Sequence, residues 1–420
     1  MIWLYNTVLL IAVIISSPYW LLRLLLSSTW RAGCRQRLGF DLPVQANPVI
    51  WLHAASVGEV KIAEALVKKL QEHKKAWPIV VSVITPTGFE QAKTNLAGLA
   101  EIIFAPLDLP FIVPRYINKL NPVLLGIIET ELWPNLITAA RKKGVKIILL
   151  NGRLSDRSYP TYQKFKLLFG EILRCLDHAC VQTGEDKERF VTLGIPEQLV
   201  SITDNIKYDF VIPSTAPAAS IRAEYLFGPG DLVWVAGSTR NDEESLLLKA
   251  FQDIRKKVPN LKLVLAPRHL GRIQEIKELL RDNNILFSLY SQKAANPVYD
   301  CLLIDTMGEL LRAYSIADVV FIGGSLANFG GQNILEPAAL AKPVICGPDM
   351  RNFKEITAYL LQHNAVIQVK TPTELTEKTE FLLTHPEAAR LLGDRARESL
   401  IAKKGALDKN MAAMERLLVL

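Results

Sequence analysis

The chain has 420 residues, half of them apolar and 22% charged, and Lys and Arg exceed Asp and Glu by 49 − 42 = 7. This length allows two domains with separate cores, and the composition excludes a disordered chain. The basic residues are spread out without interleaved aromatic residues, so we expect no nucleic-acid partner, whereas anionic small substrates or anionic lipid head groups fit the excess.

Cysteine and histidine are scarce. The five cysteines are an odd number with no Cys-x-x-Cys pair, and the chain has six histidines. A disulfide framework or a zinc site is therefore not expected, and a reducing compartment suits these thiols. The cysteines are Cys34, Cys175, Cys180, Cys301 and Cys346.

The N-terminus carries a long apolar run. Residues Ile2 to Leu22 are 21 positions without a charge, which as a helix are roughly 30 Å long and match a bilayer core. A signal peptide would carry positive charge before the run, but here arginines follow it. By the positive-inside rule we expect an uncleaved membrane anchor over residues 1–27 and a cytoplasmic body. The alternative is an interfacial hairpin that Pro18 breaks before it spans the bilayer.

Behind the anchor, apolar runs alternate with amphipathic helical patterns. Apolar strands without alternation, separated by helices, predict a parallel sheet covered on both faces. We place this first Rossmann-like domain at residues 28–212. Its expected strands are 48–53, 79–84, 101–105, 123–128, 146–150 and 178–182, with helices at 58–73 and 88–96.

The pattern restarts after a segment rich in Pro, Ala and Ser, residues 213–229, which we expect to be a linker. The second Rossmann-like domain is expected at 230–405, and a last helix within 406–420 is expected to cross back to the first domain. The fold class is therefore α/β, with two doubly wound parallel sheets facing a cleft and ligands at the carboxyl ends of the strands. Strands of the second domain are expected at 232–236, 262–266, 301–304, 319–322 and 343–346.

The segment His53–Glu59 lies where the first expected strand meets its helix. Gly58 permits a tight turn there, and Glu59 falls in the first helical turn at the carboxyl edge of the sheet. A carboxylate in that place faces the cleft and is able to accept a proton from a hydroxyl group. The segment alone is equally consistent with a glutamate that only stabilises the helix dipole.

Two more segments of the first domain end strands with charged residues. Glu129 and Glu131 emerge within Gly126–Asn135, where they are candidates to face a ligand, although paired carboxylates also bind metals or cap helices. Asn151–Arg157 carries two guanidinium groups suited to carboxylate or phosphate. A charged surface loop explains this last segment equally well.

Four strand ends of the second domain converge on one edge. Small residues in Ala236–Arg240 let backbone amides approach a phosphate, and a glycine-rich turn opens the helix of Asn328–Pro337, where Glu336 is suited to both ribose hydroxyls. Neither Gly-x-x-x-x-Gly-Lys-Ser/Thr nor Gly-x-Gly-x-x-Gly occurs, which argues against an NTPase or a dehydrogenase. The other two strand ends are Ala266–His269 and Phe321–Ser325.

Together these segments resemble the transferases of 3-deoxy-D-manno-octulosonic acid (Kdo) in lipopolysaccharide biosynthesis. The resemblance covers nearly the whole chain, and the ordered set of motifs is far more specific than any one of them. It implies a GT-B fold at the cytoplasmic face of a bacterial inner membrane, with no metal and no cofactor. The reaction that it implies is transfer of Kdo from CMP-Kdo to a lipid A precursor. The motifs are His53–Glu59, Glu129–Asn135, Arg153–Ser158, Pro267–His269, Asp305–Leu310 and Asn333–Pro337.

The resemblance also implies roles for individual residues. Glu59 corresponds to the catalytic base of an inverting transfer. One departure is Asp204, which stands before Asn205-Ile-Lys207 where we expect glycine, so the local turn is in doubt. The implied CMP site is Pro267, Arg268, Met307, Gly308, Glu309, Asn333, Ile334, Leu335 and Glu336. The candidates to contact the acceptor or the sugar acid are Ser56, Gly58, Glu129, Glu131, Arg153 and Lys207.

Two other functions are compatible with the same architecture. Another GT-B transferase that uses a UDP-sugar shares the glutamate base and the ribose-binding carboxylate. A membrane-bound sensor of sugar nucleotides is the non-enzyme alternative, and it would have no need of a carboxylate at Glu59.

Overall fold

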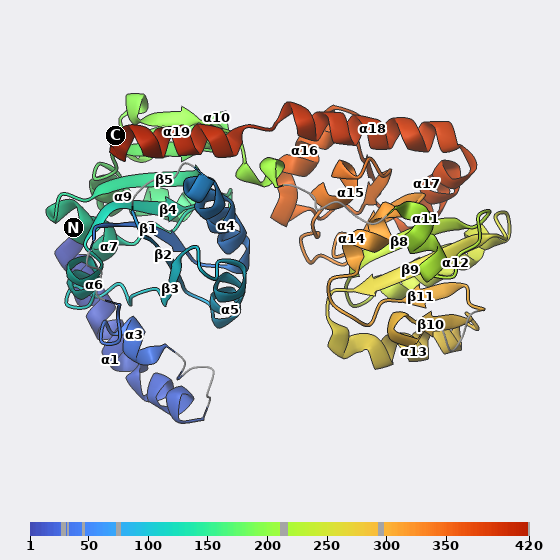
Figure 1. Ribbon diagram of the computed structural model, residues 1–420, viewed down its shortest axis with the longest axis horizontal. Coiled ribbons are helices and arrows are strands. Elements are labelled where there is room, and N and C mark those ends of the chain that lie inside the picture. Colours follow the sequence, from blue (N-terminus) through green and yellow to red (C-terminus); the bar gives the residue numbers. More distant parts are fainter. Residues whose placement is uncertain are drawn as a thin grey trace. The chain divides into compact units, whose positions relative to one another are not determined.

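The computed structural model describes residues 1–26, 31, 33–43, 47–72, 77–210, 217–292 and 298–418. It divides the chain into two compact units. The first unit comprises Met1–Phe210 together with Lys403–Leu420, and the second comprises Val211–Ala402. Each unit is built on its own parallel sheet (Figure 1).

The sheet of the first unit has seven parallel strands in the order β3-β2-β1-β4-β5-β6-β7. This is a doubly wound order, whose direction reverses between β1 and β4. The central strands β1 and β5 are buried almost throughout, as their apolar runs Val49–Leu52 and Ile147–Leu150 predict. The strands are β1 (Val49–Ala54), β2 (Ile79–Val83), β3 (Glu101–Phe104), β4 (Pro122–Ile128), β5 (Lys146–Gly152), β6 (His178–Val181) and β7 (Val200–Ile202).

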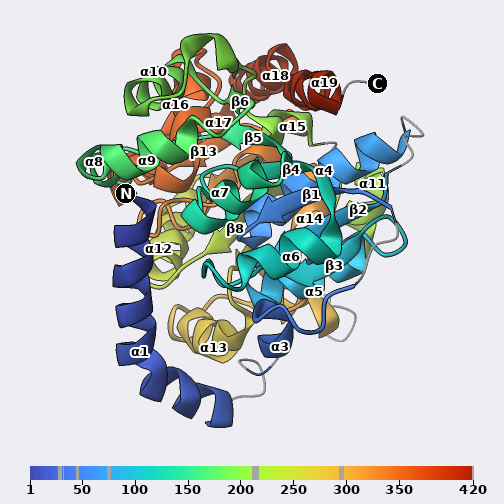
Figure 2. The ribbon, with the colours of Figure 1, turned by 90° about the vertical axis from the view of Figure 1, so that its left-hand side faces the viewer.

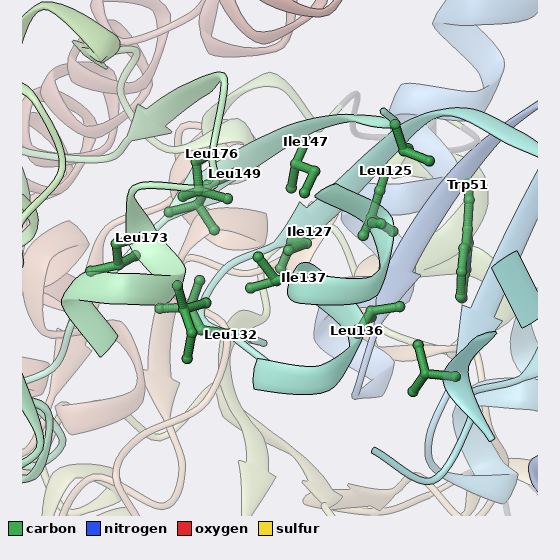
Figure 3. Close-up of a cluster of buried hydrophobic side chains, with 14 of the residues drawn as sticks. Trp51, Leu125, Ile127, Leu132, Leu136, Ile137, Ile147, Leu149, Leu173 and Leu176 are labelled. Carbon is green, nitrogen blue, oxygen red and sulfur yellow. The ribbon is translucent and has the colours of Figure 1, made fainter. Parts of the chain in front are cut away.

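Helices cover both faces of this sheet. On one face, α7 packs its apolar side against β4, and Figure 3 shows Ile137 of α7 beside Ile127 of β4. On the other face, α4 and the C-terminal helix α19 share a core with Leu52 and Ile148. The helices are α1 (Ile2–Leu26), α3 (Cys34–Arg37), α4 (Val57–Glu72), α5 (Pro86–Asn95), α6 (Val113–Leu120), α7 (Pro134–Lys142), α8 (Tyr159–Lys164), α9 (Lys166–Leu173), α10 (Gly184–Leu193) and α19 (Ala406–Leu418), with the 3-10 helices η1 (Glu197–Leu199) and η2 (Ile206–Asp209).

The second unit has a parallel sheet in the order β10-β11-β9-β8-β12-β13-β14. Its order reverses between β8 and β12. The strands are β8 (Leu232–Thr239), β9 (Leu261–Pro267), β10 (Phe287–Leu289), β11 (Cys301–Leu303), β12 (Val319–Ile322), β13 (Val344–Cys346) and β14 (Ile367–Gln368). The helices are α11 (Ala218–Glu224), α12 (Glu243–Arg255), α13 (Ile273–Asp282), α14 (Leu310–Ser315), α15 (Leu335–Ala339), α16 (Lys354–Gln362), α17 (Pro372–Thr384) and α18 (Pro386–Ala402), with η3 (Leu270–Arg272), η4 (Tyr290–Gln292) and η5 (Arg351–Phe353).

The expected linker differs from the structure. Residues 211–216 lie outside the described residues, but the following segment forms α11 of the second unit, with Ile221 and Tyr225 fully buried. The alanines after Pro217 are strong helix formers, so a composition typical of linkers here encodes a short helix. The last residues of the expected C-terminal helix, 419–420, also lie outside the described residues.

The N-terminal helix α1 is the single helix in the described part of the chain that is long and apolar enough to cross a membrane. It continues through Pro18, so the expected alternative of a hairpin broken at this proline does not hold. A proline leaves the carbonyl four residues earlier without its N–H donor, but the Ser17 hydroxyl donates to the Ile14 carbonyl at 2.7 Å.

The turn at Asp204 explains why glycine is absent there. Asp204 has a φ of 62°, in the left-handed region that glycine adopts most readily and aspartate tolerates better than most residues. Its carboxylate pairs with Lys403 at 2.7 Å and with Lys409 at 2.9 Å, and both lysines belong to the C-terminal segment. The aspartate therefore forms the turn and also fastens α19 to the first unit.

We predict that Asp204→Ala lowers the free energy of unfolding of the first unit by roughly 1–2 kcal/mol, because alanine fits the left-handed conformation poorly and both ion pairs are lost. Asp204→Gly is the matched control, which removes the same ion pairs but relieves the backbone, and it should recover part of the loss. Thermal unfolding followed by circular dichroism compares the three proteins. Equal stability of the alanine and glycine variants would contradict a backbone role for this position.

Candidate active site

The reversal point of the first sheet brings two expected motifs together. Strand β1 runs beside β4, with His53 paired to Ile127 in the parallel register. The segment after β1 carries Glu59, and the segment after β4 carries Glu129 and Glu131. Because parallel strands end at the same edge, these carboxylates gather where ligands bind in doubly wound sheets.

Glu59 occupies the third position of α4 and is held by the residues that precede the helix. The Ala55 amide donates to Glu59 Oε2 at 2.7 Å, and the Ser56 hydroxyl donates to Glu59 Oε1 at 3.0 Å. The Glu59 amide in turn donates to Ser56 Oγ at 3.4 Å, an arrangement related to a capping box in which the carboxylate accepts from the Ala55 amide. The dipole-stabilising role that the sequence left open is thus present, and it fixes the carboxylate in one orientation.

A helix cap on the surface would keep an ordinary acidity, but Glu59 is only 7% exposed. Burial raises the pKa of Glu59 to about 8, the hydrogen bond from Ala55 opposes the rise, and the nearby charges of Glu131 and Glu129 add to it. A carboxylate with a pKa near 8 is a stronger base than an exposed one. This is the pKa range of general bases that work near neutral pH.

The two carboxylates of the neighbouring segment have separate partners. Glu129, at a positive φ of 57°, pairs with Lys207 at 2.9 Å, and both side chains are about one-fifth exposed. Glu131 Oε2 accepts a hydrogen bond from Trp133 Nε1 at 2.9 Å, and burial raises its pKa. Three carboxylates and one lysine therefore share this edge of the sheet.

Lys207 reaches Glu129 because of a buried polar network at the carboxyl ends of β5 and β6. Asn151 Oδ1 accepts from the Ile206 amide at 2.9 Å, and Asn205 donates to Gln182 Oε1 at 2.8 Å. Asn410 of α19 accepts from the Asn151 amide at 3.1 Å. The C-terminal helix thus stabilises the turn that presents Lys207.

His53 lies at the end of β1 and is fully buried, and burial lowers its pKa to about 3, so it is neutral. Trp51 Nε1 donates to Ser82 Oγ at 2.8 Å, and the same hydroxyl lies 2.8 Å from His53 Nδ1. The Ser82 hydroxyl thus accepts from the indole and shares a hydrogen bond with the imidazole, whose Nε2 is buried without a hydrogen-bond partner among the described residues. The ring lies edge-on to Trp133, with 4.5 Å between their centroids.

The remaining candidates of the first unit differ in their surroundings. Gly58 has no positive φ, and a Cβ there would meet only Ser56 Oγ, at 3.7 Å. The expected tight turn is therefore wrong, and within this unit a side chain at Gly58 has room. Arg153 is half-buried after β5, and its carbonyl accepts from the Thr130 hydroxyl.

In the second unit, the reversal point between β8 and β12 is organised by an acid that sequence reasoning missed. Glu243 is completely buried, and its carboxylate accepts from the amides of Gly324 at 2.6 Å, Leu326 at 2.9 Å and Arg240 at 3.0 Å. The Arg240 amide, which belongs to a segment expected to meet a phosphate, is thus already bonded to a carboxylate. An acidic residue near a helix start is ordinarily explained by the helix dipole, so the sequence held no specific signal.

The neighbouring acid Glu244 connects the end of β8 with the segment that follows β9. It pairs with Arg272 at 2.8 Å and accepts from the Thr239 hydroxyl at 2.8 Å. Pro267 ends β9, and the amide of the exposed Arg268 donates to the Thr239 carbonyl at 3.0 Å. Arg268 is therefore held at the end of β8 with its side chain outward.

The other CMP-site candidates lie in two loops. Met307 is 74% exposed, Gly308 has a φ of 91°, and Glu309 pairs with Arg312 at 2.8 Å. The expected helix near Asn333 begins later and is short, since α15 spans Leu335–Ala339. Asn333 Oδ1 accepts from the Leu335 amide at 3.1 Å, and Ile334 and Leu335 are buried.

Glu336 lies half-buried in the first turn of α15. Among the described residues, no three His, Cys, Asp or Glu side chains are arranged to hold a metal ion.

Comparison with known proteins assigns the family. The family model described as 3-deoxy-D-manno-octulosonic-acid transferase (Kdotransferase) matches residues 32–210. A 3-deoxy-D-manno-octulosonic acid transferase of Haemophilus influenzae is 35% identical over 387 residues, which cover 91% of each protein. The chain belongs to this family. The resemblance seen in the motifs is thereby confirmed.

Other Kdo transferases extend the similarity over almost the full length. The enzyme of Chlamydophila psittaci is 28% identical over 98% of this chain and 96% of its own. A bifunctional glycosyltransferase/methyltransferase of Fusobacterium nucleatum is 34% identical over 90% of this chain but only 59% of its own length. The family similarity therefore includes both units.

Solved structures of low sequence identity confirm the fold class. A glycosyltransferase of Rickettsia africae has a TM-score of 0.60 at 14% identity and matches 89% of this chain and all of its own. The UDP-GlcNAc 2-epimerase of Neisseria meningitidis has a TM-score of 0.61 at 13% identity, over 88% of this chain and all of its own. The fold is GT-B-like, with two parallel α/β sheets.

The raised pKa of Glu59 predicts a pH-dependent cost to stability. A carboxyl group whose pKa is higher in the folded state stabilises the fold fully below its unfolded pKa, and this contribution is lost as pH rises to about 8. We therefore expect Glu59→Gln, which stays neutral, to melt at a higher temperature than the wild type at pH 9, with a smaller difference at pH 5. The control is Glu64→Gln on the same helix, which removes a surface partner of Lys68. An equal gain for both variants would contradict a buried carboxyl group at Glu59.

Proposed function

We propose that this Kdo transferase moves Kdo from CMP-Kdo to a lipid A precursor, with Glu59 as the base of an inverting transfer. The observation that carries the assignment of the base is one buried carboxylate, oriented by Ala55 and Ser56 and raised to a pKa of about 8. It lies at the reversal point of the sheet, at the strand edge where ligands bind in this fold.

The proposed step forms one bond and breaks one. An acceptor hydroxyl attacks the anomeric carbon of Kdo, its proton passes to Glu59, and the bond from that carbon to the CMP phosphate breaks. The negative charge leaves with CMP. Gly58 has no Cβ and lies beside Glu59, so it supports a close approach of the acceptor to the base.

We assign Lys207 and Arg153 to the anionic groups of the substrates, and Glu129 and Glu131 to their hydroxyl groups. Lys207 is held at this edge by its ion pair with Glu129 at 2.9 Å, within the group of residues around Glu59. Ser56 is grouped with Glu59, because its hydroxyl donates a hydrogen bond to the Glu59 carboxylate. These residues make the first unit the acceptor side of the reaction.

The second unit is the proposed donor side. We assign Glu336 to the ribose, and Pro267, Met307, Gly308, Glu309 and Asn333–Leu335 to the remainder of CMP. Arg268 is held at a strand end with its guanidinium exposed, so it is suited to a phosphate. Because α15 is short, this proposal assigns the stabilisation of the departing phosphate to charged side chains and not to the dipole of that helix.

The proposed location is the cytoplasmic face of a bacterial inner membrane. The apolar helix α1 supports attachment to lipid, and the arginines that follow it support a cytoplasmic body. A lipid acceptor has its sugar head group at that surface. The proposed partners are therefore CMP-Kdo, the lipid A precursor and the membrane.

Glu59→Gln tests the role of the base. Glutamine keeps the size and one hydrogen-bond acceptor but cannot take up the proton, so we predict a loss of at least about 100-fold in turnover with CMP binding unchanged. Turnover is measured by mass spectrometry of the lipid product after incubation with CMP-Kdo and a lipid A precursor. CMP binding is measured by calorimetry.

Glu336→Ala is the matched control, and it should weaken CMP binding by roughly 1–3 kcal/mol, the cost of losing a charged hydrogen-bond acceptor. Near-normal turnover of Glu59→Gln would move the base to Glu129 or Glu131. Competition by UMP that equals competition by CMP would favour a UDP-sugar donor. CMP binding with no lipid product from the wild type would favour a sensor.

A further inference from the structure

The segment between β11 and α14 has fixed ends and an open tip. It comprises Asp305–Glu309, and we call it the donor loop because Met307, Gly308 and Glu309 are assigned to CMP. Met307 is 74% exposed, Gly308 has a φ of 91°, and a Cβ at Gly308 would meet nothing within 4 Å. The tip therefore has room for a ligand, and the contacts at the two ends decide how the tip is presented.

The first end of the donor loop is held by η4, the 3-10 helix that follows β10. The Ser291 amide donates to Asp305 Oδ1 at 3.0 Å, and the Ser291 hydroxyl donates to Asp305 Oδ2 at 2.5 Å. Tyr290, the preceding residue of η4, packs edge-on against Tyr225, with 5.5 Å between the ring centroids. Because Tyr225 is fully buried at the end of α11, η4 is fixed to the interior of the second unit.

The second end of the donor loop is held by Arg312 of α14. Its Nη1 atom donates to Glu309 Oε2 at 2.8 Å and to the Tyr290 hydroxyl at 3.1 Å. Its Nη2 atom donates to Glu224, the last residue of α11, and the Tyr290 hydroxyl donates to Glu224 at 3.0 Å. Helix α11 also packs on α14 (Figure 1, Figure 2). The guanidinium group thus connects Glu309 with two elements outside the donor loop.

These ion pairs are better suited to orienting Glu309 than to stabilising the fold. The three side chains are partly exposed, Arg312 by 31%, Glu309 by 19% and Glu224 by 39%. Ion pairs between partly exposed groups contribute little to the free energy of unfolding. A guanidinium group, in contrast, presents a planar set of donors that fixes the geometry of the carboxylates it binds. The contact therefore determines where the Glu309 carboxylate points.

The charge of Glu309 gives a second reason for the contact. A donor such as CMP-Kdo carries a phosphate, and its sugar is also an acid. An unpaired carboxylate in the donor loop would repel these anionic groups. Among the residues that the structure describes, Arg312 is the one cation paired with Glu309. The guanidinium group therefore cancels a charge that would oppose binding of the donor.

We propose that Arg312 is a positioning residue for the sugar-nucleotide donor. It acts through Glu309, whose carboxylate it orients and whose charge it cancels, so that the donor loop is ordered before the donor binds. The inference rests on the proposed donor side of the second unit. It adds to that side a residue which lies outside the CMP-site candidates.

Steady-state kinetics of Arg312→Gln tests the proposal. Glutamine lacks the charge and the planar set of donors, so we expect the KM for CMP-Kdo to rise by about tenfold or more. The KM for the lipid acceptor and kcat at saturating donor should stay close to wild type, because only donor binding is affected. Arg312→Lys restores the charge without the planar donors, so it should recover part of the loss. A lower kcat with an unchanged KM for CMP-Kdo is the result of a purely structural role, and it would overturn the proposal.

Calorimetry with CMP on the full-length protein shows whether Arg312 acts through Glu309. Arg312→Gln should weaken CMP binding by about tenfold in the wild-type background, but hardly at all in a Glu309→Gln background. Glu224→Gln is the control, which leaves the contact between Arg312 and Glu309 in place and should cause a smaller loss. Equal losses from Arg312→Gln in both backgrounds would overturn the proposal. Wild-type protein that does not bind CMP would instead contradict the donor side itself, and with it this inference.

Discussion

The central constraint in this protein is a carboxylate, Glu59, buried at the junction of β1 and α4. Burial disfavours its charge, and Glu131 and Glu129 disfavour it further, while the Ala55 amide and the Ser56 hydroxyl favour it. The balance leaves a pKa of about 8. The same two hydrogen bonds orient the carboxylate, so the groups that hold it in place are the ones that oppose the rise of its pKa.

Other residues of the first unit set the charges around Glu59. His53 is buried beside the site but neutral, so it adds no charge of its own. Lys207 neutralises Glu129, and the network of Asn151, Asn205 and Asn410 holds the turn that presents the lysine. The C-terminal helix thus contributes to the site from more than two hundred residues away in the chain.

Much of this arrangement was predictable from the sequence, because long buried strands leave a strong signal. The runs Val49–Leu52, Pro122–Ile128 and Leu232–Ala236 are apolar without interruption, and an expected motif follows each of them. The edge strands β7, β10 and β14 were not predicted. They have two or three residues each, too few for any periodicity to show.

Other features depend on contacts that a sequence does not encode locally. Glu243 resembles any acid at a helix start until three amides are seen to point at it. Tyr5 and Asn6 stand within an apolar run, and only the positions of Asp108 and Asn135 reveal that they bind protein. Gly58 suggested a tight turn, but its backbone is ordinary and a Cβ there would meet only Ser56 Oγ.

The pH dependence of turnover tests the role of the buried carboxylate most directly. Measured as kcat/KM for the lipid acceptor, which reports ionisations of the enzyme before the acceptor binds, the wild-type rate should rise with pH through an ionisation near pH 8, as Glu59 loses its proton. In Glu131→Gln the same rise should occur at lower pH, because a carboxylate that raises the pKa of Glu59 is gone while glutamine still accepts from Trp133. A rate that is flat from pH 6 to pH 9, or a profile that Glu131→Gln leaves unmoved, would contradict the account.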